Sequence, residues 1–173
     1  PIPQRHIGSD MLPSVIKSIK AYLEKKDVEF LLETKVKKID KKNDCFDIKL
    51  ENEKTITCKF VIGATGRSGS DWLISEAKRL DIKTKFAPID IGVRVEVPAV
   101  IMENIVEYAW DPKFHIYTKS FDDFVRTFCT CPNGFVVMED YGEYIGVNGR
   151  SNFNTKSENT NFAFLVNIKL TKP

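Results

Sequence analysis

The sequence predicts a mixed α/β fold in two parts, and three features carry this prediction. Apolar residues recur at helical spacing from residue 11 to residue 23. Three β-rich runs, separated by the turn-like stretches "KKND" and "ENE", follow within residues 34–59. A continuous apolar run, "FVI", then breaks into "GATGRSGSDW", where glycines lead into a second helical pattern. Alternating runs begin after residue 86, so the second part is predicted to be largely antiparallel.

The first part is predicted to occupy residues 1–85. Ser9 is the candidate N-cap of a helix over about residues 10–26. Two apolar runs, residues 27–32 and 60–65, are predicted as buried strands, and the second has the continuous apolar character of a strand in a parallel sheet. Between them, "TKVKKID", "CFDIKL" and "KTITCK" predict a three-stranded β-meander. A helix over about residues 70–80 follows.

The second part is predicted to occupy residues 86–173. "IGVRVEVP" alternates as a strand does, Pro98 opens a short helix, and "FHIYTKSF", "FVRTFCTC" and "GFVVMED" have the pattern of successive antiparallel strands. Asn148 and Gly149 are a tight-turn signal in a polar loop, residues 146–159. This loop is either a lid over a substrate cavity or a surface that packs on other polypeptide. "TNFAFLVNIKL" is the predicted last strand.

Composition limits the class of protein. The chain has 173 residues, 42% of them hydrophobic, which suits one domain or two small ones. Its 26 basic and 24 acidic residues give a net charge of +2, which does not favour a nucleic-acid partner. No apolar run approaches the roughly 20 residues that span a bilayer, and no signal peptide opens the chain. The cysteines, Cys45, Cys58, Cys129 and Cys131, lack a disulfide framework, so we expect reduced thiols and a cytoplasmic location.

The stretch "GATGRSG" admits two interpretations. Gly63, Gly66 and Gly69 either relieve crowding at a tight strand-to-helix connection or expose main chain to a ligand. Ligands in open α/β sheets bind at the carboxyl ends of strands. Arg67 is able to pair with a phosphate, and the N–H groups at a helix N-terminus favour negative charge. No GxGxxG sequence and no P-loop occur in the chain, so the stretch by itself does not decide.

Several short motifs together resemble a known family. They are "HIGSDML", "VEFLLETKVKKID", "TITCKFVIGATGRSG", "DIGVRVEVP", "DPKF", "VRTFCTCPNG" and "TNFAFLV", and they cover nearly the whole chain. Their order is similar to that in two-dinucleotide-fold flavoproteins. More narrowly, it resembles the uncharacterised FAD-dependent dehydrogenases, also called NAD(FAD)-utilising dehydrogenases. The resemblance implies part of a Rossmann-like FAD-binding domain followed by a substrate-side α+β domain.

The resemblance also implies ligands and the residues that contact them. FAD is the implied cofactor, NAD(P) the electron partner and a small molecule the substrate. The residues implied to contact FAD are Val36 at the adenine through its backbone, then Ala64, Thr65, Gly66 and Arg67 along the dinucleotide, and Gly8, Ser9 and Asp10 toward the flavin. The main phosphate loop and a closing acidic residue are implied to lie outside this sequence. We therefore expect an internal fragment that is inactive by itself.

Cys129 and Cys131 allow three interpretations. They are structural thiols, thiols that face flavin or substrate, or metal ligands. Residues two apart in a strand point to the same face, so both sulfurs are expected on one side. A metal site requires further ligands at suitable spacing, and these are missing, so no metal site is predicted.

Catalytic residues are not identified by any motif, and the weak candidates are Arg126, Cys129 and His6. Arg126 is able to hold a substrate carboxylate or charge near the flavin, and a packing role is the alternative. His6 lies beside Gly8, whereas His115 in an alternating strand is interpreted as structural. Arg94 and Glu96 share a strand face and predict an ion-paired sheet surface.

Two other classes of function remain open. One is a binding module for a nucleotide or a protein without redox chemistry. The other is a structural segment that self-associates through exposed edges. The missing phosphate loop favours these for the isolated chain, and the family motifs favour an oxidoreductase for the longer protein.

Overall fold

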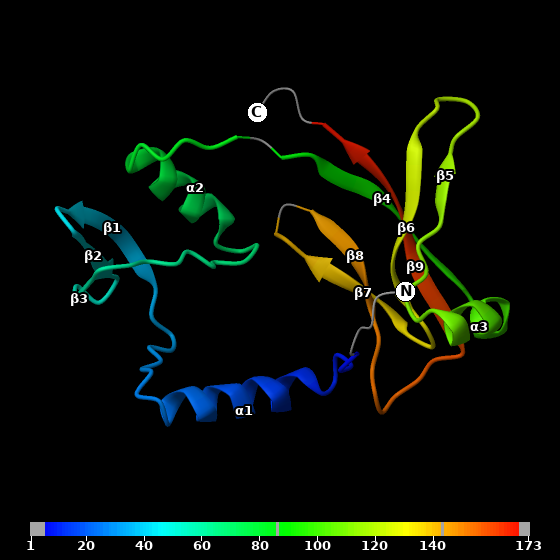
Figure 1. Ribbon diagram of the computed structural model, residues 1–173, viewed down its shortest axis with the longest axis horizontal. Coiled ribbons are helices and arrows are strands. Elements are labelled where there is room, and N and C mark those ends of the chain that lie inside the picture. Colours follow the sequence, from blue (N-terminus) through cyan, green and yellow to red (C-terminus); the bar gives the residue numbers. More distant parts are fainter. Residues whose placement is uncertain (1–5, 86, 143, 170–173) are drawn as a thin grey trace. The chain divides into compact units, whose positions relative to one another are not determined.

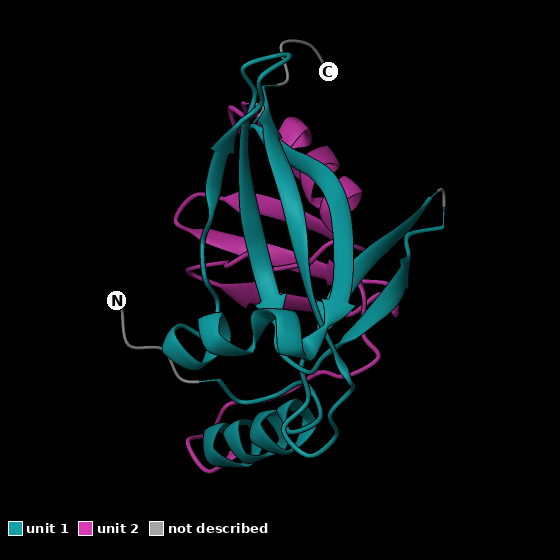
Figure 2. Ribbon diagram, turned by 90° about the vertical axis from the view of Figure 1, so that its right-hand side faces the viewer, with its two compact units in different colours: residues 1–23, 86–173 teal, residues 24–85 magenta. Residues whose placement is uncertain are grey.

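The computed structural model describes residues 6–85, 87–142 and 144–169, which contain three helices and nine strands in a mixed α/β order (Figure 1). All of the strand pairs in this part of the chain are antiparallel. The chain divides into two compact units (Figure 2). We call residues 24–85 the meander unit, and residues 1–23 with 86–173 the sheet unit. The predicted domains, 1–85 and 86–173, place residues 1–23 differently, and they stay a prediction.

The meander unit contains the predicted three-stranded meander. β1 (Val36–Lys42), β2 (Cys45–Leu50) and β3 (Thr55–Cys58) pair in the order β1-β2-β3. Ile39, Ile48 and Ile56 lie side by side across the three strands, as period-2 alternation requires. Ile39 and Leu50 are buried. The meander prediction is confirmed.

Helix α2 (Ser70–Arg79) covers the open edge of β1. Trp72, Glu76 and Arg79 follow one another at helical spacing, so they share a face of α2. Trp72 Nε1 donates to the Lys37 carbonyl at 3.4 Å, Glu76 Oε2 accepts from Ile39 N at 2.8 Å, and Arg79 Nη2 donates to the Ile39 carbonyl. These bonds satisfy main-chain groups that an edge strand otherwise leaves unpaired. The polar face of α2 therefore completes the meander.

The two apolar runs predicted as buried strands are not strands. Residues 28–31 and 60–65 are irregular, and no described strand pairs with them. Their apolar side chains are exposed, with Phe60 at 86% and Ile62 at 91%. A strand buried on both faces requires hydrogen-bonded neighbours and covering layers, because its backbone groups are otherwise left without partners. Apolar composition alone does not supply these.

The sheet unit is built on a four-stranded sheet of order β4-β9-β6-β5, which Figure 2 shows in teal. Its strands are β4 (Ile89–Pro98), β5 (His115–Tyr117), β6 (Phe124–Cys131) and β9 (Asn159–Ile168). Helix α3 (Ala99–Tyr108) follows Pro98 as predicted and buries Met102. Met102, Phe114 and side chains of β5, β6 and β9 line an open apolar pocket of about 150 Å³. Helix α1 (Leu12–Glu24) has no buried residue.

A separate two-stranded sheet corrects two predictions. β7 (Phe135–Asp140) pairs with β8 (Ile145–Arg150), not with β6. The polar loop predicted from residue 146 therefore begins only after Arg150. Asn148 and Gly149 lie inside β8, and the chain reverses near Gly142, whose φ is +82°. Gly149 is not in the left-handed region that an Asn-Gly hairpin turn demands.

The connection from β6 to β7 follows turn chemistry. Gly134 N donates to the Cys131 carbonyl at 3.2 Å, and Asn133 has φ +48°. Pro132 followed by a positive-φ Asn suits a type II turn. None of the described helices has the length and apolar character to cross a membrane.

Replacing Glu76 by Gln tests how α2 holds β1. Glu76 is only 8% exposed, and Arg79 beside it lowers the pKa of its carboxyl group. We expect Glu76→Gln to reduce the free energy of local opening by about 1–3 kcal/mol, since charged hydrogen bonds are lost. The measurement is amide exchange of residues 36–42. The effect should be complete above pH 4.5 and fade at lower pH, because protonation of Glu76 removes the same bonds.

Asp44→Asn is the matched control, since it removes an exposed carboxylate from the β1–β2 turn of the same unit. Equal exchange of β1 in Glu76→Gln and Asp44→Asn would contradict this role of Glu76.

Candidate functional site

The three glycines of the strand-to-helix connection have different surroundings. A Cβ atom at Gly63 would lie 3.0 Å from Leu73 Cδ1, and one at Gly69 would lie 2.6 Å from Thr65 Cβ. These two glycines therefore allow close packing within the turn. Gly66 differs, because its φ is +65° and, apart from its two chain neighbours, no atom of the described residues lies within 4 Å of the Cβ position. Open space adjoins the main chain at Gly66.

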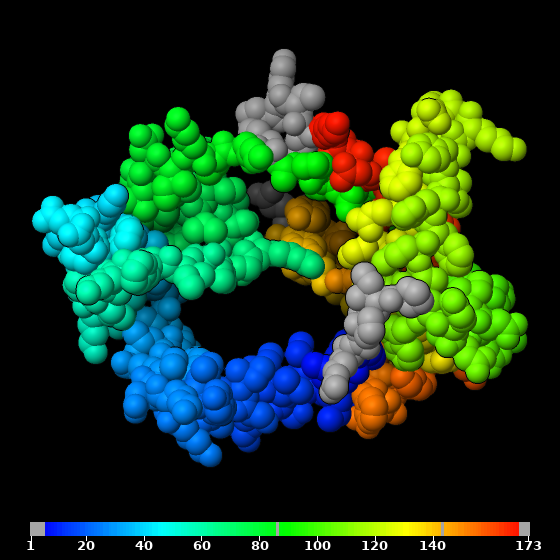
Figure 3. All heavy atoms as spheres, in the orientation of Figure 1, coloured from blue at the N-terminus to red at the C-terminus, as the bar shows by residue number. Residues whose placement is uncertain are grey.

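The residues beside Gly66 leave part of this connection uncovered. Ala64 is exposed, and the hydroxyl of Thr65 is buried without a hydrogen-bond partner among the described residues. Figure 3 shows the teal-green stretch around residues 60–66 as a narrow arm. An unpartnered hydroxyl next to open main chain fits the group that the family resemblance implies, since buried polar atoms require partners. Neighbouring side chains of the described residues therefore do not occupy the space beside Gly66.

The start of α2 is less open to a phosphate than predicted. Gly69 is the N-cap and has no side-chain cap, while Ser70 N donates to the Arg67 carbonyl and Leu73 N to the Gly69 carbonyl. Asp71 places a carboxylate in the first turn. This charge already complements the positive end of the helix dipole.

Gly8, Ser9 and Asp10 organise a loop of the sheet unit. Ser9 N donates to the Ser151 carbonyl at 2.8 Å. The Asp10 carboxylate accepts from Phe153 N at 2.6 Å and from Asn154 N at 2.9 Å, and these bonds lower the pKa of Asp10. A Cβ at Gly8 would lie 2.6 Å from Phe153 N. The tripeptide therefore fixes residues 151–154.

Ser9 is not the N-cap of the first helix. Helix α1 begins at Leu12. Residues 8–11 form a turn that the bond from Met11 N to the Gly8 carbonyl closes at 3.2 Å, and Val15 N donates to the Met11 carbonyl, so the helix starts after Ser9.

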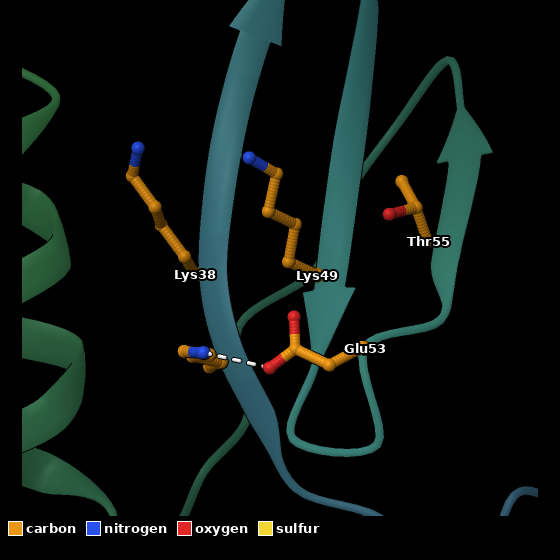
Figure 4. Close-up of a pocket in the computed structure, with 5 residues that line it drawn as sticks. Lys38, Lys49, Glu53 and Thr55 are labelled. Atoms are coloured by element: carbon orange, nitrogen blue, oxygen red, sulfur yellow. Dashed lines mark hydrogen bonds and ion pairs between the residues drawn. The ribbon is translucent and has the colours of Figure 1, made fainter.

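Val36 begins β1 opposite Leu50, beside a surface groove of about 380 Å³. Lys37, Lys38, Lys49, Glu53 and Thr55 line this groove, and Lys38 and Lys49 extend in the same direction in Figure 4. Lys37 pairs with Glu53 at 2.9 Å, while Lys38 and Lys49 pair with Asp40 at 2.7 and 3.1 Å. These lysines lower the pKa of Asp40 to about 2. The groove therefore carries paired charges and does not indicate an anion site.

Arg126 and the histidines have structural contacts. Arg126 Nη2 pairs with Asp90 at 2.6 Å, and its guanidinium lies 5.0 Å from the Phe128 ring. His6 packs on Trp110 with ring centroids 4.9 Å apart, and His115 meets Phe124 edge-on at 5.0 Å. Each of the three side chains therefore has a partner in the sheet unit, and the catalytic roles of Arg126 and His6 stay predictions.

Cys129 and Cys131 lie in a cluster organised by Arg94. Arg94 Nη2 donates to the Cys129 carbonyl at 2.8 Å and lies 3.5 Å from Cys131 Sγ. Arg94 Nε donates to Asn161 Oδ1 at 2.8 Å. A Cβ at Gly149 would lie 1.7 Å from Arg94 Nη2, so only glycine leaves room for the guanidinium. Arg94 was predicted on an ion-paired sheet surface with Glu96, and this is wrong.

The two thiols have different pKa values. Hydrogen bonding with the Cys131 thiol and the nearby charge of Arg94 lower the pKa of Cys129 to about 6. The same hydrogen bond and burial raise the pKa of Cys131. No group of three or more His, Cys, Asp or Glu side chains suited to a metal occurs in the described ranges.

The predicted site residues fall in both units. Val36 and residues 64–67 belong to the meander unit. Gly8–Asp10, His6, Arg126 and Cys129 belong to the sheet unit. Within the sheet unit, Arg94 and Asn161 join Cys129, and the prediction from sequence missed both. The only signal was Arg94 itself, which alternates with Glu96 in "IGVRVEVP".

Comparison with known proteins assigns the chain to a family. The family described as "Pyridine nucleotide-disulphide oxidoreductase" matches residues 4–102, more than half of the 173 residues. The chain belongs to the pyridine nucleotide-disulphide oxidoreductase family. A second family, described as "FAD-dependent protein, C-terminal domain-like", matches residues 88–172. Together the two matches place the chain among FAD-dependent oxidoreductases, with a Rossmann-like fold for the first family.

A search of curated proteins finds a longer protein that is similar to this chain. An uncharacterized protein of Clostridium beijerinckii is 30% identical over 178 residues. The alignment covers 94% of this chain and 32% of the relative. The chain therefore spans about a third of the length of that relative.

Asp10→Asn tests whether the Asp10 carboxylate fixes residues 151–154. Its loss leaves two loop N–H groups with a weaker acceptor. We expect trypsin to cleave after Lys156 several-fold faster in this variant, because the loop opens more often. Asp122→Asn, an exposed carboxylate of the same unit, is the control. Peptide mass spectrometry over time measures both, and identical cleavage rates would exclude the anchoring role.

Proposed function

We propose that this chain supplies FAD-binding and substrate-side residues of a longer FAD-dependent oxidoreductase, a dehydrogenase that transfers hydride at flavin N5. Family membership supports the cofactor class. The observation that carries the proposal is the open, left-handed main chain at Gly66 next to the unpartnered hydroxyl of Thr65. When bound, the flavin supplies the two-electron chemistry.

The residues of this chain have binding and positioning roles in the proposal. Ala64, Thr65 and Gly66 hold the dinucleotide through main-chain groups and the Thr65 hydroxyl, with Arg67 beside them. Val36 contributes its backbone at the adenine. Gly8, Ser9 and Asp10 act through the loop that Asp10 fixes, on the flavin side. The acid or base of the reaction is not assigned to any of these residues.

The exposed apolar runs support the interpretation as a fragment. Residues 28–32 and 60–62 have strand-like composition and exposed side chains. In the proposed enzyme, these runs pair with strands from other parts of the longer protein. We also propose a cytoplasmic location. NAD(P) is the proposed electron partner.

A binding module without redox activity is the second candidate. The same exposed apolar runs favour it, since large exposed apolar surface marks contact with another polypeptide or with a second copy. In that case the chain binds a nucleotide or protein partner and transfers no electrons.

Gly66→Val in the full-length protein tests the flavin site. A valine Cβ would occupy the open space at Gly66, so we expect a folded protein that purifies with little flavin. Gly142→Val is the matched control, because Gly142 also has a positive φ and, in the described part of the chain, no atom beyond its chain neighbours within 4 Å of its Cβ position. Both variants suffer the same kind of backbone strain. The visible absorbance per protein measures flavin content.

Flavin loss in Gly66→Val alone supports the site. Equal flavin content in the two folded variants would show that this turn does not contact the cofactor.

Anaerobic addition of NADH or NADPH to the purified full-length protein tests the redox proposal. We expect one of them to bleach the flavin absorbance through hydride transfer. Bound flavin that neither nucleotide reduces would remove NAD(P) as the partner. A colourless protein that still binds a nucleotide would favour the binding module.

A further inference from the structure

The sequence contains two Asn-Gly pairs, Asn133–Gly134 and Asn148–Gly149. In such a pair, the main-chain nitrogen of the glycine can attack the side-chain carbonyl carbon of the asparagine, because glycine has no side chain that hinders the approach. Ring closure requires that this nitrogen lies beside the carbonyl group and is not held elsewhere. The structure gives the two pairs different surroundings, so their reactivity should differ.

The side chain of Asn148 is turned toward the main chain of Gly149. Gly149 N donates to Asn148 Oδ1 at 2.8 Å, and Asn148 Nδ2 donates to Glu139 Oε1 at 3.0 Å. Since an ionised carboxylate only accepts, the second bond identifies which end of the amide faces Gly149. The Tyr141 hydroxyl donates to Oε2 of Glu139 and holds that carboxylate. The Gly149 nitrogen therefore lies beside the carbonyl group that it would attack.

A positive charge adjoins Gly149. The Arg94 guanidinium occupies the position that a Cβ atom of Gly149 would take. Its bonds to Asn161 Oδ1 and the Cys129 carbonyl, both 2.8 Å long, keep it there. A nearby cation lowers the free energy of negative charge on the attacking nitrogen and on the oxygen that becomes anionic. Arg94 therefore favours both the ionisation of the amide and the attack.

The strand that carries Asn148 is held on one side. Within the described ranges, β8 pairs with β7 alone. A two-stranded sheet is only marginally stable by itself, so the hairpin opens locally more easily than the four-stranded sheet. Opening gives the main chain at Asn148 the rotation that ring closure needs. Asn148 and Gly149 are half-buried, so water reaches them when the hairpin opens.

The other pair is held in a conformation that prevents attack. Strand β6 ends in a bulge at Cys129, whose φ is +49°, and Asn133 lies in the turn that follows. Gly134 N donates to the Cys131 carbonyl at 3.2 Å, so the nitrogen that would attack is committed to this turn. Asn133 Nδ2 donates to the Ser157 carbonyl at 3.1 Å. Both partners of the reaction are therefore occupied elsewhere.

We propose that Asn148 is a modification site, at which the chain forms a succinimide with Gly149 and is converted to aspartate and isoaspartate. The fold protects Asn133 from the same reaction. This site is separate from the flavin proposal and does not depend on it.

The reaction balances with water as the co-reactant. The Gly149 amide gives its proton to hydroxide and its nitrogen attacks Asn148 Cγ, so an N–Cγ bond forms and Oδ1 takes the electron pair of the C=O bond. The Cγ–Nδ2 bond then breaks, and Nδ2 takes up a proton and leaves as ammonia. Water opens the ring at either carbonyl carbon, which gives aspartate in a normal main chain or isoaspartate. No electrons are transferred.

The product should loosen the junction of the two sheets. A carboxylate at position 148 has no N–H group for Glu139 and repels it. Isoaspartate also adds a carbon atom to the main chain of β8, so Gly149 no longer fits against the Arg94 guanidinium. Since that guanidinium joins the four-stranded and the two-stranded sheets, amide exchange of residues 135–140 should become faster as the protein is converted.

The test is incubation of the folded full-length protein in mildly alkaline buffer, followed by digestion with a protease that cleaves after glutamate. Cleavage after Glu139 and Glu143 places Asn133 and Asn148 in different peptides. Mass spectrometry measures the mass gain from replacement of NH₂ by OH, and electron-transfer fragmentation identifies isoaspartate. We expect Asn148 to be converted about tenfold faster than Asn133, because Gly134 N stays bonded to the Cys131 carbonyl.

Two controls separate the effect of the fold from that of the sequence. In the urea-unfolded protein, Asn133 and Asn148 should react at similar rates, since both precede glycine and neither is held. Asn152 and Asn154 precede larger residues in the same peptide as Asn148, so they should stay unconverted in the folded protein. Asn148→Gln should slow conversion at this position strongly, because its longer side chain closes a larger ring, and should leave Asn133 unchanged.

Four results would overturn the proposal. They are equal rates at Asn133 and Asn148 in the folded protein, the same rate ratio in the folded and the unfolded protein, conversion of Asn148 no faster than that of Asn152, and a mass gain at Asn148 without isoaspartate. The first comparison uses the unaltered protein, so it decides the question even if a substitution disturbs folding. None of these readouts uses flavin, so they are independent of the Gly66→Val result.

Discussion

The sheet unit depends on the guanidinium of Arg94. It extends from β4, donates to Asn161 on β9 and to the Cys129 carbonyl on β6, and occupies the space left by the missing side chain of Gly149 on β8. A partly buried cation requires well-placed acceptors, since its desolvation is otherwise costly. Here all the observed acceptors are neutral groups or a sulfur. One side chain thus links the four-stranded sheet to the two-stranded sheet, and it determines the charge around the cysteines.

The meander unit uses the same principle at smaller scale. A three-stranded sheet of short strands has little apolar interior, and only Ile39 and Leu50 are buried hydrophobic residues among those described in this unit. Hydrogen bonds from α2 to the open edge of β1 compensate for this. Glu76 and Arg79 contact both the N–H and the carbonyl group of Ile39, so the helix replaces a missing neighbouring strand. Each unit is therefore held together by a polar side chain that completes backbone pairing.

The parts of the fold that depend on local pattern were predicted from the sequence, and the parts that depend on distant partners were not. Period-2 alternation predicted the meander and β4, and helical spacing predicted α2. The strand predicted at residues 60–65 was wrong, because a parallel strand forms only beside other strands that bond to its backbone. The turn predicted at Asn148 and Gly149 was wrong, because both residues lie in β8 and Gly149 leaves space for the Arg94 guanidinium. At the candidate site, "GATG" pointed to the open main chain at Gly66, whereas no local signal joins Arg94 to residue 161.

The backbone conformation of Cys129 sets chemistry against stability. A residue with a side chain costs of order 1 kcal/mol or more in the left-handed region, where glycine fits without strain. The protein therefore pays a conformational penalty to present sulfur at this position. A search for more stable variants would favour glycine there and would discard the thiol, so thermostability gained at residue 129 would come at the expense of whatever the sulfur does.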